Sequence, residues 1–273
     1  MENTASAKNR QDRSEELIRT QKLVTTLARN DFRTRFAGSY LGIVWAFVQP
    51  IVTIFVYWFV FSTLRAHAVR EVPFVLWLIA GLVPWFYFQE ALNSGTNSLI
   101  EYSYLVKKVV FNIDILPMVK LCSALYVHAF FVAVVVILYT VMGHFPGISV
   151  LQLLYYSLCM FLMVLGVSYL TSSVVIFFRD LSQIINIVLQ VGVWMTPIMW
   201  NFDDLHLNRI LQYIFKLNPM YYIVSGYRDS LINKVWFWQH PALTAYFWVF
   251  TIGMFVLGRR VFNRLRVHFA DVL

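Results

Sequence analysis

Charged residues are scarce in this chain. They make up 13% of its 273 residues, whereas 59% are hydrophobic and 18% are aromatic. An average soluble domain carries about 25% charged residues, because its surface must be hydrated. The composition therefore excludes an ordinary water-soluble domain and indicates a protein that crosses a membrane several times.

Cysteine is also scarce, with Cys122 and Cys159 as the only two. Both lie inside hydrophobic segments, and no histidine cluster or paired-cysteine spacing accompanies them. A disulfide framework and a zinc site are therefore not supported. We interpret both cysteines as packing residues.

Sequence motifs of catalysis are missing as well. The chain contains no GxxxxGK[ST], GxSxG or HExxH pattern, so we expect no catalytic site, no metal site and no cofactor bound by this chain. A proton-coupled carrier would normally need a carboxylate within its spans. The nearest candidate is Glu90, which we interpret as a helix-end residue.

Long apolar segments are what the sequence does contain. The first, 41–64, has no Asp, Glu, Lys, Arg or His and would be about 36 Å long as a helix, enough to cross a bilayer core. The same criterion gives an all-α polytopic membrane protein with six transmembrane helices, at about 41–64, 73–96, 115–142, 149–178, 181–200 and 241–260. In the fourth span, small residues predict close approach of a neighbouring helix: Gly166, Ser168, Thr171, Ser172 and Ser173.

Residues 1–40 precede the spans and read as a polar tail followed by an amphipathic helix. Between 15 and 36, Val24, Ala28 and Phe32 share one face, whereas Arg19 and Lys22 lie on the other. This pattern predicts an interfacial helix against membrane lipids, with an ordinary solvated helix as the alternative. The first forty residues are too polar for a cleavable signal peptide.

The segment 201–240 is apolar only in short pieces, interrupted by charged residues and by Asn218-Pro219. It is too broken to span and predicts re-entrant or interfacial helices before the sixth span. Six spans would place 201–240 on one side of the membrane and both termini on the other. Of the 22 lysines and arginines, six fall on the side of 201–240 and sixteen on the side of the termini. By the positive-inside rule, both termini are expected in the cytoplasm, with 263–273 as a cytoplasmic tail and 201–240 outside. The net charge of +8 thus requires no nucleic acid.

Polar residues within two spans suggest a conduit wall. Each amide shares one face of its helix with neighbouring residues. The residues predicted to line a conduit in this way, on the first and fifth spans, are Trp45, Gln49, Val52, Phe55, Phe59, Gln183, Asn186 and Gln190. Amides can meet hydroxyl groups, and aromatic rings can stack on sugars. Hydrogen bonds between packed helices explain the amides equally well.

The loop after the second span contains an amphipathic pattern of Leu99, Tyr102, Leu105 and Val106. A short helix of this kind can dock into a groove of another protein. Packing against its own bundle is the alternative.

Four ordered motifs give the chain a resemblance to a known family: LGIVWAFVQPIVTIFVYWFVF at 41–61, FFRDL at 177–181, TPIMW at 196–200 and LNPMYYIVSGYRDSL at 217–231. Together they resemble the ABC-2 type permeases that export polysaccharides, with teichoic-acid permeases nearest and O-antigen permeases next. The resemblance extends from about residue 15 to the end and covers a transmembrane domain at 41–262.

That resemblance implies a permease without an ATPase of its own, in a bacterial cytoplasmic membrane. It implies a homodimer with two separate ATP-binding subunits, which would hold ATP and Mg²⁺. It further implies a coupling helix at about 98–108, where Leu99, Glu101, Tyr102, Leu105 and Val106 would meet the ATPase. An undecaprenyl-diphosphate-linked polymer would enter beside the basic residues Arg33, Arg35, Lys107 and Lys108.

Three functions therefore remain open. The first is an ATP-driven exporter of a cell-envelope polymer, with wall teichoic acid preferred over O-antigen or capsule. The second is a carrier or channel that works without an ATPase. The third is an assembly scaffold for a cell-envelope synthase.

Overall fold

The chain folds into helices. The computed structural model describes residues 2–35, 38–64, 72–107, 112–201 and 208–272, and every regular element in these ranges is helical. The prediction of an all-α protein is confirmed for this part of the chain. Helices predominate because a backbone in lipid can pair its own N–H and C=O groups only within helices or closed barrels.

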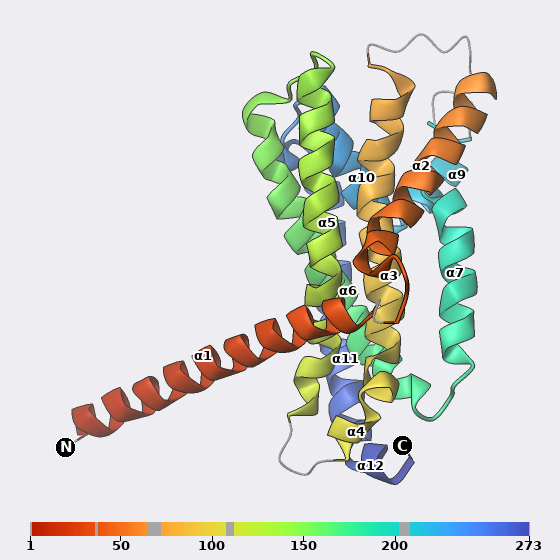
Figure 1. Ribbon diagram of the computed structural model, residues 1–273. Coiled ribbons are helices and arrows are strands. Elements are labelled where there is room, and N and C mark those ends of the chain that lie inside the picture. The colour runs from red at the N-terminus through yellow and green to blue at the C-terminus, as the bar shows by residue number, and fades with distance from the viewer. Residues whose placement is uncertain (1, 36–37, 65–71, 108–111, 202–207, 273) are drawn as a thin grey trace.

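Four long helices form the centre of the bundle: α3 (Phe74–Glu101), α5 (Leu116–Val141), α6 (Gln152–Val175) and α11 (Pro241–Leu265). Two further helices, α2 (Trp45–Leu64) and α7 (Leu181–Met195), lie beside α3 at the edge of this bundle (Figure 1). The most apolar part of α2 contains no buried residue, whereas two thirds of the corresponding part of α3 is buried. The core is therefore built around α3, and α2 presents a large apolar surface.

Within the described residues, five helices are long and apolar enough to cross a membrane. They correspond to the predicted spans at 41–64, 73–96, 115–142, 149–178 and 241–260. The predicted fifth span, 181–200, is shorter than expected, because α7 ends at Met195 and its 15 residues reach only about 22 Å. Thr196 is extended (φ −98°, ψ 130°), since the ring of Pro197 disfavours a helical conformation in the residue before it. A sixth complete crossing thus stays a prediction.

Helix α3 is longer than expected at its other end. The second span was predicted to end at about residue 96, but α3 continues to Glu101 and breaks at Tyr102 (φ −101°, ψ 28°). A separate short helix, α4 (Ser103–Val106), follows. The single helix predicted at 98–108 is therefore two pieces, of which 98–101 belongs to α3.

The N-terminal helix α1 (Glu2–Thr34) is one continuous helix that begins well before residue 15. Its sequence contains no glycine or proline to interrupt it. In Figure 1, α1 projects sideways from the bundle. Val24 and Ala28 are buried against Ile115 and Val119 in a small apolar cluster separate from the main core, which confirms the predicted apolar face.

The predicted re-entrant region contains α9 (Arg209–Lys216) and α10 (Pro219–Arg228). Helix α10 packs against α3 and α6 and lies in the half of the bundle opposite α4 and α12 (Phe269–Val272) in Figure 1. Its Tyr227 hydroxyl lies 2.9 Å from His128 Nε2 and 2.7 Å from Ser157 Oγ. The neighbouring residue in α10, Arg228, donates to the carbonyls of Pro197 (2.6 Å) and Ile198 (2.7 Å). Helix α10 is thereby tied to the segment after α7.

Glycines set the distance between α6 and α11. A Cβ atom added to Gly166 would lie 2.8 Å from the backbone nitrogen of Phe255, and one added to Gly258 would lie 2.3 Å from the carbonyl oxygen of Gly166. Ser168 likewise approaches Gly95 of α3, and Thr171 Oγ1 lies 2.8 Å from Thr96 Oγ1. The close approach predicted for the fourth span is confirmed at these positions.

Gly258→Ala tests this crossing. The new methyl group would overlap backbone atoms that cannot rotate away, so we expect α6 and α11 to separate at a cost of about 1–3 kcal/mol. Thermal unfolding of the purified protein in detergent should occur at a lower temperature. The matched control is Gly253→Ala in the same helix, because a Cβ there meets nothing within 4 Å. Equal unfolding temperatures for the two variants would contradict the proposed backbone contact.

Candidate functional site: a cavity and a polar junction

A cavity of about 640 Å³ lies between α2, α3, α5 and α7. Its polar and aromatic lining comprises Arg35, Trp45, Gln49, Thr53, Tyr57, Trp85, Phe86, Tyr87, Gln89, Glu90, His128, Phe131, Gln190 and Trp194. The cavity exists because α2 packs only loosely on the bundle. Its volume lies within the range of about 300–1,000 Å³ found for small-molecule sites.

The cavity combines uncharged amides with aromatic rings. Gln49, Gln89 and Gln190 provide donors and acceptors from three different helices. Trp85 and Trp194 add wide apolar faces beside them. Such a lining suits a neutral, hydroxyl-rich group that can hydrogen-bond and also offer C–H groups to a ring.

The predicted conduit residues divide into two sets. Trp45, Gln49 and Gln190 line the cavity. Val52, Phe55 and Phe59 do not: they lie on the opposite side of α2, where 52%, 58% and 61% of their surfaces are exposed. The stripe predicted along α2 is therefore not one wall of this cavity, and a role for its outer half stays a prediction.

On α7, the predicted residues also separate. Asn186 accepts a hydrogen bond from Asn93 Nδ2 of α3 at 3.0 Å, as the alternative of helix pairing predicted. Gln183 is exposed and outside the cavity lining. Sequence reasoning missed Trp85, Gln89 and Trp194, because a helical wheel for one helix does not show which neighbour it faces.

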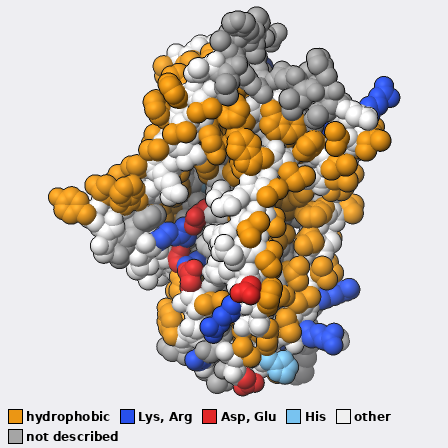
Figure 2. Space-filling view, turned by 90° about the vertical axis from the view of Figure 1, so that its right-hand side faces the viewer, with side chains coloured by type: hydrophobic (Ala, Val, Ile, Leu, Met, Phe, Trp, Pro, Cys, Tyr) orange, Lys and Arg blue, Asp and Glu red, His pale blue; other side chains and the backbone are white. Residues whose placement is uncertain are grey.

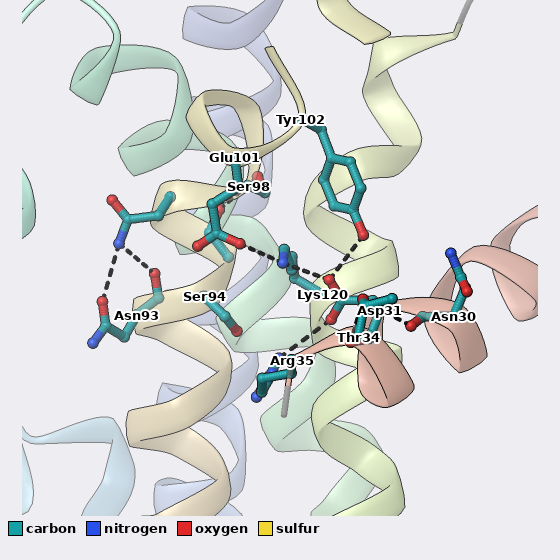
Figure 3. A network of polar contacts seen from close by, with 12 residues as sticks. Asn30, Asp31, Thr34, Arg35, Asn93, Ser94, Ser98, Glu101, Tyr102 and Lys120 are labelled. Atoms are coloured by element: carbon teal, nitrogen blue, oxygen red, sulfur yellow. Dashed lines mark hydrogen bonds and ion pairs between the residues drawn. The ribbon is translucent and has the colours of Figure 1, made fainter. Parts of the chain in front are cut away.

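Beside the cavity lies a cluster of polar and charged residues that we call the polar junction: Asp31 of α1, Arg35 just after the end of α1, Glu90 and Glu101 of α3, Tyr102, and Lys120 of α5. Lys120 Nζ lies 2.5 Å from Asp31 Oδ1 and 2.5 Å from Glu101 Oε2. Figure 3 shows Lys120 between the two carboxylates, with the Tyr102 hydroxyl directed at Asp31. Three helices and the start of α4 thus meet at one ionic cluster.

The second arm of the polar junction runs towards the cavity. Arg35 Nη2 lies 3.3 Å from Asp31 Oδ2, and Arg35 Nη1 pairs with Glu90 Oε1. Arg35 and Glu90 also line the 640 Å³ cavity. Figure 2 shows charged side chains of both signs gathered in a hollow whose border is largely hydrophobic.

Asp31 and Lys120 are each only 5% exposed. Burial by itself would raise the pKa of Asp31, but the hydrogen bond and positive charge of Lys120 outweigh it and hold the pKa below its usual range. Burial and the Asp31 carboxylate raise the pKa of Tyr102, which therefore stays a donor. Asp31 is consequently ionised at neutral pH, and removing Lys120 alone would leave a buried carboxylate short of its partner, which typically costs about 3–5 kcal/mol.

A smaller cavity of about 480 Å³ opens at this junction and is lined entirely by polar residues: Asp31, Thr34, Arg35, Glu90, Asn93, Ser94, Asn97, Glu101 and Lys120. It holds three carboxylates and two cations, so its balance is acidic rather than basic. Asn93 and Asn97 connect it to α7, since Ser182 Oγ donates to Asn97 Oδ1 at 2.6 Å. The lining of this cavity resembles a solvated joint between helices more than a site for a phosphate.

The structure scatters the predicted entrance residues. Arg35 is engaged by Asp31 and Glu90, whereas Arg33 and Lys107 are exposed. Lys108 lies outside the described residues. Of the three described cations, only Arg35 belongs to the polar junction, and contact with a substrate phosphate stays a prediction for all four predicted residues.

The predicted coupling residues divide by exposure. Leu99 is fully buried and Val106 is 7% exposed, both in the protein's own core, while Leu105 and Tyr102 are partly buried. Leu99 and Val106 thus pack on the bundle, and a role in ATPase coupling stays a prediction for all five residues. A partner docking here would instead meet Glu101, Tyr104 and Lys107, all of which are exposed.

A double variant tests how α7 is held. We expect Asn93→Ala with Asn97→Ala to release α7 from α3, because the hydrogen bonds to Asn186 and Ser182 are lost. Two such bonds within a membrane contribute about 1 kcal/mol together, so amide hydrogen exchange in α7 should quicken roughly five- to ten-fold. Gln183→Ala, on the exposed side of α7, is the control. Unchanged exchange in the double variant would show that the two amides do not hold the helix.

Comparison with known proteins adds the family. Residues 22–232 match the family described as ABC-2 type transporter. The chain is 24% identical over 253 residues to an O-antigen export system permease protein of Klebsiella pneumoniae, covering 92% of this chain and 95% of that protein. It is 24% identical to an O-antigen export system permease protein of Myxococcus xanthus (78% and 81% covered) and 21% identical to a polysialic acid transport protein of Escherichia coli (77% and 81%). With a bundle of apolar helices and a family match across most of its length, this chain belongs to the ABC-2 type transporter family.

Proposed function

We propose that this chain is the membrane permease of an ATP-driven exporter for a lipid-linked cell-envelope polysaccharide. The observation that carries the proposal is the match to O-antigen export permeases across 92% of the chain. The amide and aromatic lining of the 640 Å³ cavity supports it, because sugar hydroxyls and ring faces fit that chemistry.

The preference for teichoic acid is not supported by these relatives. Their names refer to O-antigen and to polysialic acid, which favours the polysaccharide alternative. The cavity's amides are uncharged, and its one arginine is paired with Glu90. We therefore place a polysaccharide before a polyol-phosphate polymer.

The partners follow from the same proposal. Two separate ATP-binding subunits would hold ATP and Mg²⁺ and dock at the end bearing α4. A second copy of this chain would cover part of the exposed apolar surface of α2 and α7, where Phe55, Phe59, Ile187 and Val191 are all more than half exposed. Both termini would be cytoplasmic, since sixteen of the 22 basic residues lie on that side under six crossings.

The first test is assembly and substrate. Purification of the tagged chain from its native host is expected to bring down an ATP-binding subunit in a one-to-one ratio, with two copies of each. Depletion of the chain should cause a lipid-linked polysaccharide to accumulate inside the cell, and compositional analysis would identify its sugars.

Each contrary outcome has a distinct meaning. Accumulated polyol phosphate would restore teichoic acid as the substrate. Transport by the purified chain without any ATPase would support the carrier alternative. Normal export in depleted cells, with cell-envelope enzymes recovered in place of the ATPase, would support the scaffold alternative.

The second test concerns the cavity. We expect Gln49→Leu combined with Gln190→Leu to lower the export rate roughly thirty-fold, because each lost hydrogen bond weakens contact with the polymer by about 1 kcal/mol. Pulse labelling of surface polysaccharide measures the rate at equal protein levels. The control is Val60→Leu, at an exposed position of α2 outside the cavity lining. Unaltered export in the double variant would remove the cavity from the transport path.

A further inference from the structure

The charged residues of the polar junction connect two places that the proposed function leaves separate. Glu101 ends α3, and Tyr102 marks the break before α4. Arg35 and Glu90 stand at the border of the cavity. Asp31 accepts a hydrogen bond from Tyr102 at the break and forms an ion pair with Arg35 at the cavity. The contacts therefore run without a gap from the α3–α4 break to the cavity (Figure 3).

Few of the described side chains of α1 pack against the bundle. Its described apolar attachment is the small cluster in which Val24 and Ala28 meet Ile115 and Val119, outside the main core. In addition, Phe32 contacts the ring of Tyr126 at 5.5 Å. Because α1 is 33 residues long and projects sideways, a small rotation at its docked end moves its far end by many ångströms (Figure 1).

The ionic contacts are suited to setting that angle. Asp31 and Lys120 are both 5% exposed, so water and salt screen their attraction only weakly. Lys120 belongs to α5, at the centre of the bundle, and its ammonium group pairs with Asp31 of α1 and with Glu101 at the end of α3. A shift of the α3–α4 break would therefore move the side chains of Glu101 and Tyr102. Because Tyr102 bonds Asp31 directly and Glu101 is linked to it through Lys120, Asp31 would move as well.

We propose that Asp31, Glu101 and Lys120 form an ionic latch that transmits displacement of the α3–α4 break to α1, and thereby to Arg35 at the border of the cavity. These are positioning residues, since none is assigned contact with the polymer. The role of the ATPase as the source of the displacement rests on the proposed function. The attachment of α1 by the latch does not.

The test compares a neutral variant with its matched control. Asp31→Asn, Glu101→Gln and Lys120→Met together remove the charges with little change in shape, and leave no buried ion unpaired. The control removes the same three charges at exposed positions outside the latch: Glu15→Gln, Lys22→Met and Asp180→Asn. Recovery of each variant from the membrane and its co-purification with the ATPase are measured first, so that misfolding is recognised.

The readout is the distance between spin labels at Gln21→Cys in α1 and Ile137→Cys in α5, both exposed positions, with Cys122 and Cys159 changed to alanine. For the chain alone, we expect a narrow distribution in the control and a broad one in the neutral variant. With the ATPase trapped in its ATP-bound state, the distance should shift in the control, and the shift should be lost in the neutral variant. Polymer-stimulated ATP hydrolysis should fall to its basal level only in the neutral variant.

Single substitutions of Lys120, which pairs with both carboxylates, complete the test. Lys120→Arg keeps a cation that reaches both carboxylates and should restore the narrow distribution and the ATP-dependent shift, whereas Lys120→Met should lose both. An identical narrow distribution in the neutral variant and the control would overturn the latch. If the distribution broadens as expected but no ATPase is recovered with any variant, the latch stands and the proposed function fails.

Discussion

A polar group in the membrane needs a partner, and the polar stripe of α3 shows how far this requirement shapes the molecule. Glu90, Asn93, Asn97 and Glu101 recur along one side of the helix. Each is satisfied by a different neighbour: Arg35 at the end of the α1 segment, Asn186 and Ser182 of α7, and Lys120 of α5. The arrangement of three helices around α3 follows from the pairing of this one stripe.

The rest of the bundle depends on close packing instead. Gly166 and Gly258 let α6 and α11 touch backbone to backbone, which gives the core a rigid side. The side formed by α2 and α7 is loose and encloses the 640 Å³ cavity. A transporter requires both a closely packed part and a loosely packed part, because some helices must move while the others keep their positions. The polar junction lies where the two sides meet.

Much of this architecture was predictable from hydrophobicity and length. The five long spans were placed within a few residues of their observed positions, because an uninterrupted apolar segment of this length has few alternatives to a helix in lipid. The end of α7 was placed five residues too late, although Pro197 was visible in the sequence. The end of α3 was placed about five residues too early, at residue 96, whereas α3 continues to Glu101 and its Asn93 and Asn97 are hydrogen-bonded to Asn186 and Ser182 of α7.

The candidate site was less predictable, since it depends on which helix faces which. Gln49 and Gln190 were recognised as polar residues within apolar spans, but the same reasoning grouped Phe55 and Phe59 with them, on a side of α2 that faces away from the cavity. Arg35 was predicted to contact a substrate phosphate, and in the structure its guanidinium forms ion pairs with Asp31 and Glu90. Periodicity orients a helix about its own axis, and does not identify its neighbours.

The sequence by itself determined the membrane location, the helical class, the approximate spans and the resemblance to ABC-2 permeases, since these depend on local composition and on motifs read along the chain. The tertiary structure alone decided that Asp31, Glu101 and Lys120 meet, though 89 residues separate Asp31 from Lys120. It also decided that Leu99 and Val106 face inward and that three glutamines from three helices share one cavity. Contacts of this kind arise from how the helices pack together, which depends on the shape and pairing of every surface at once.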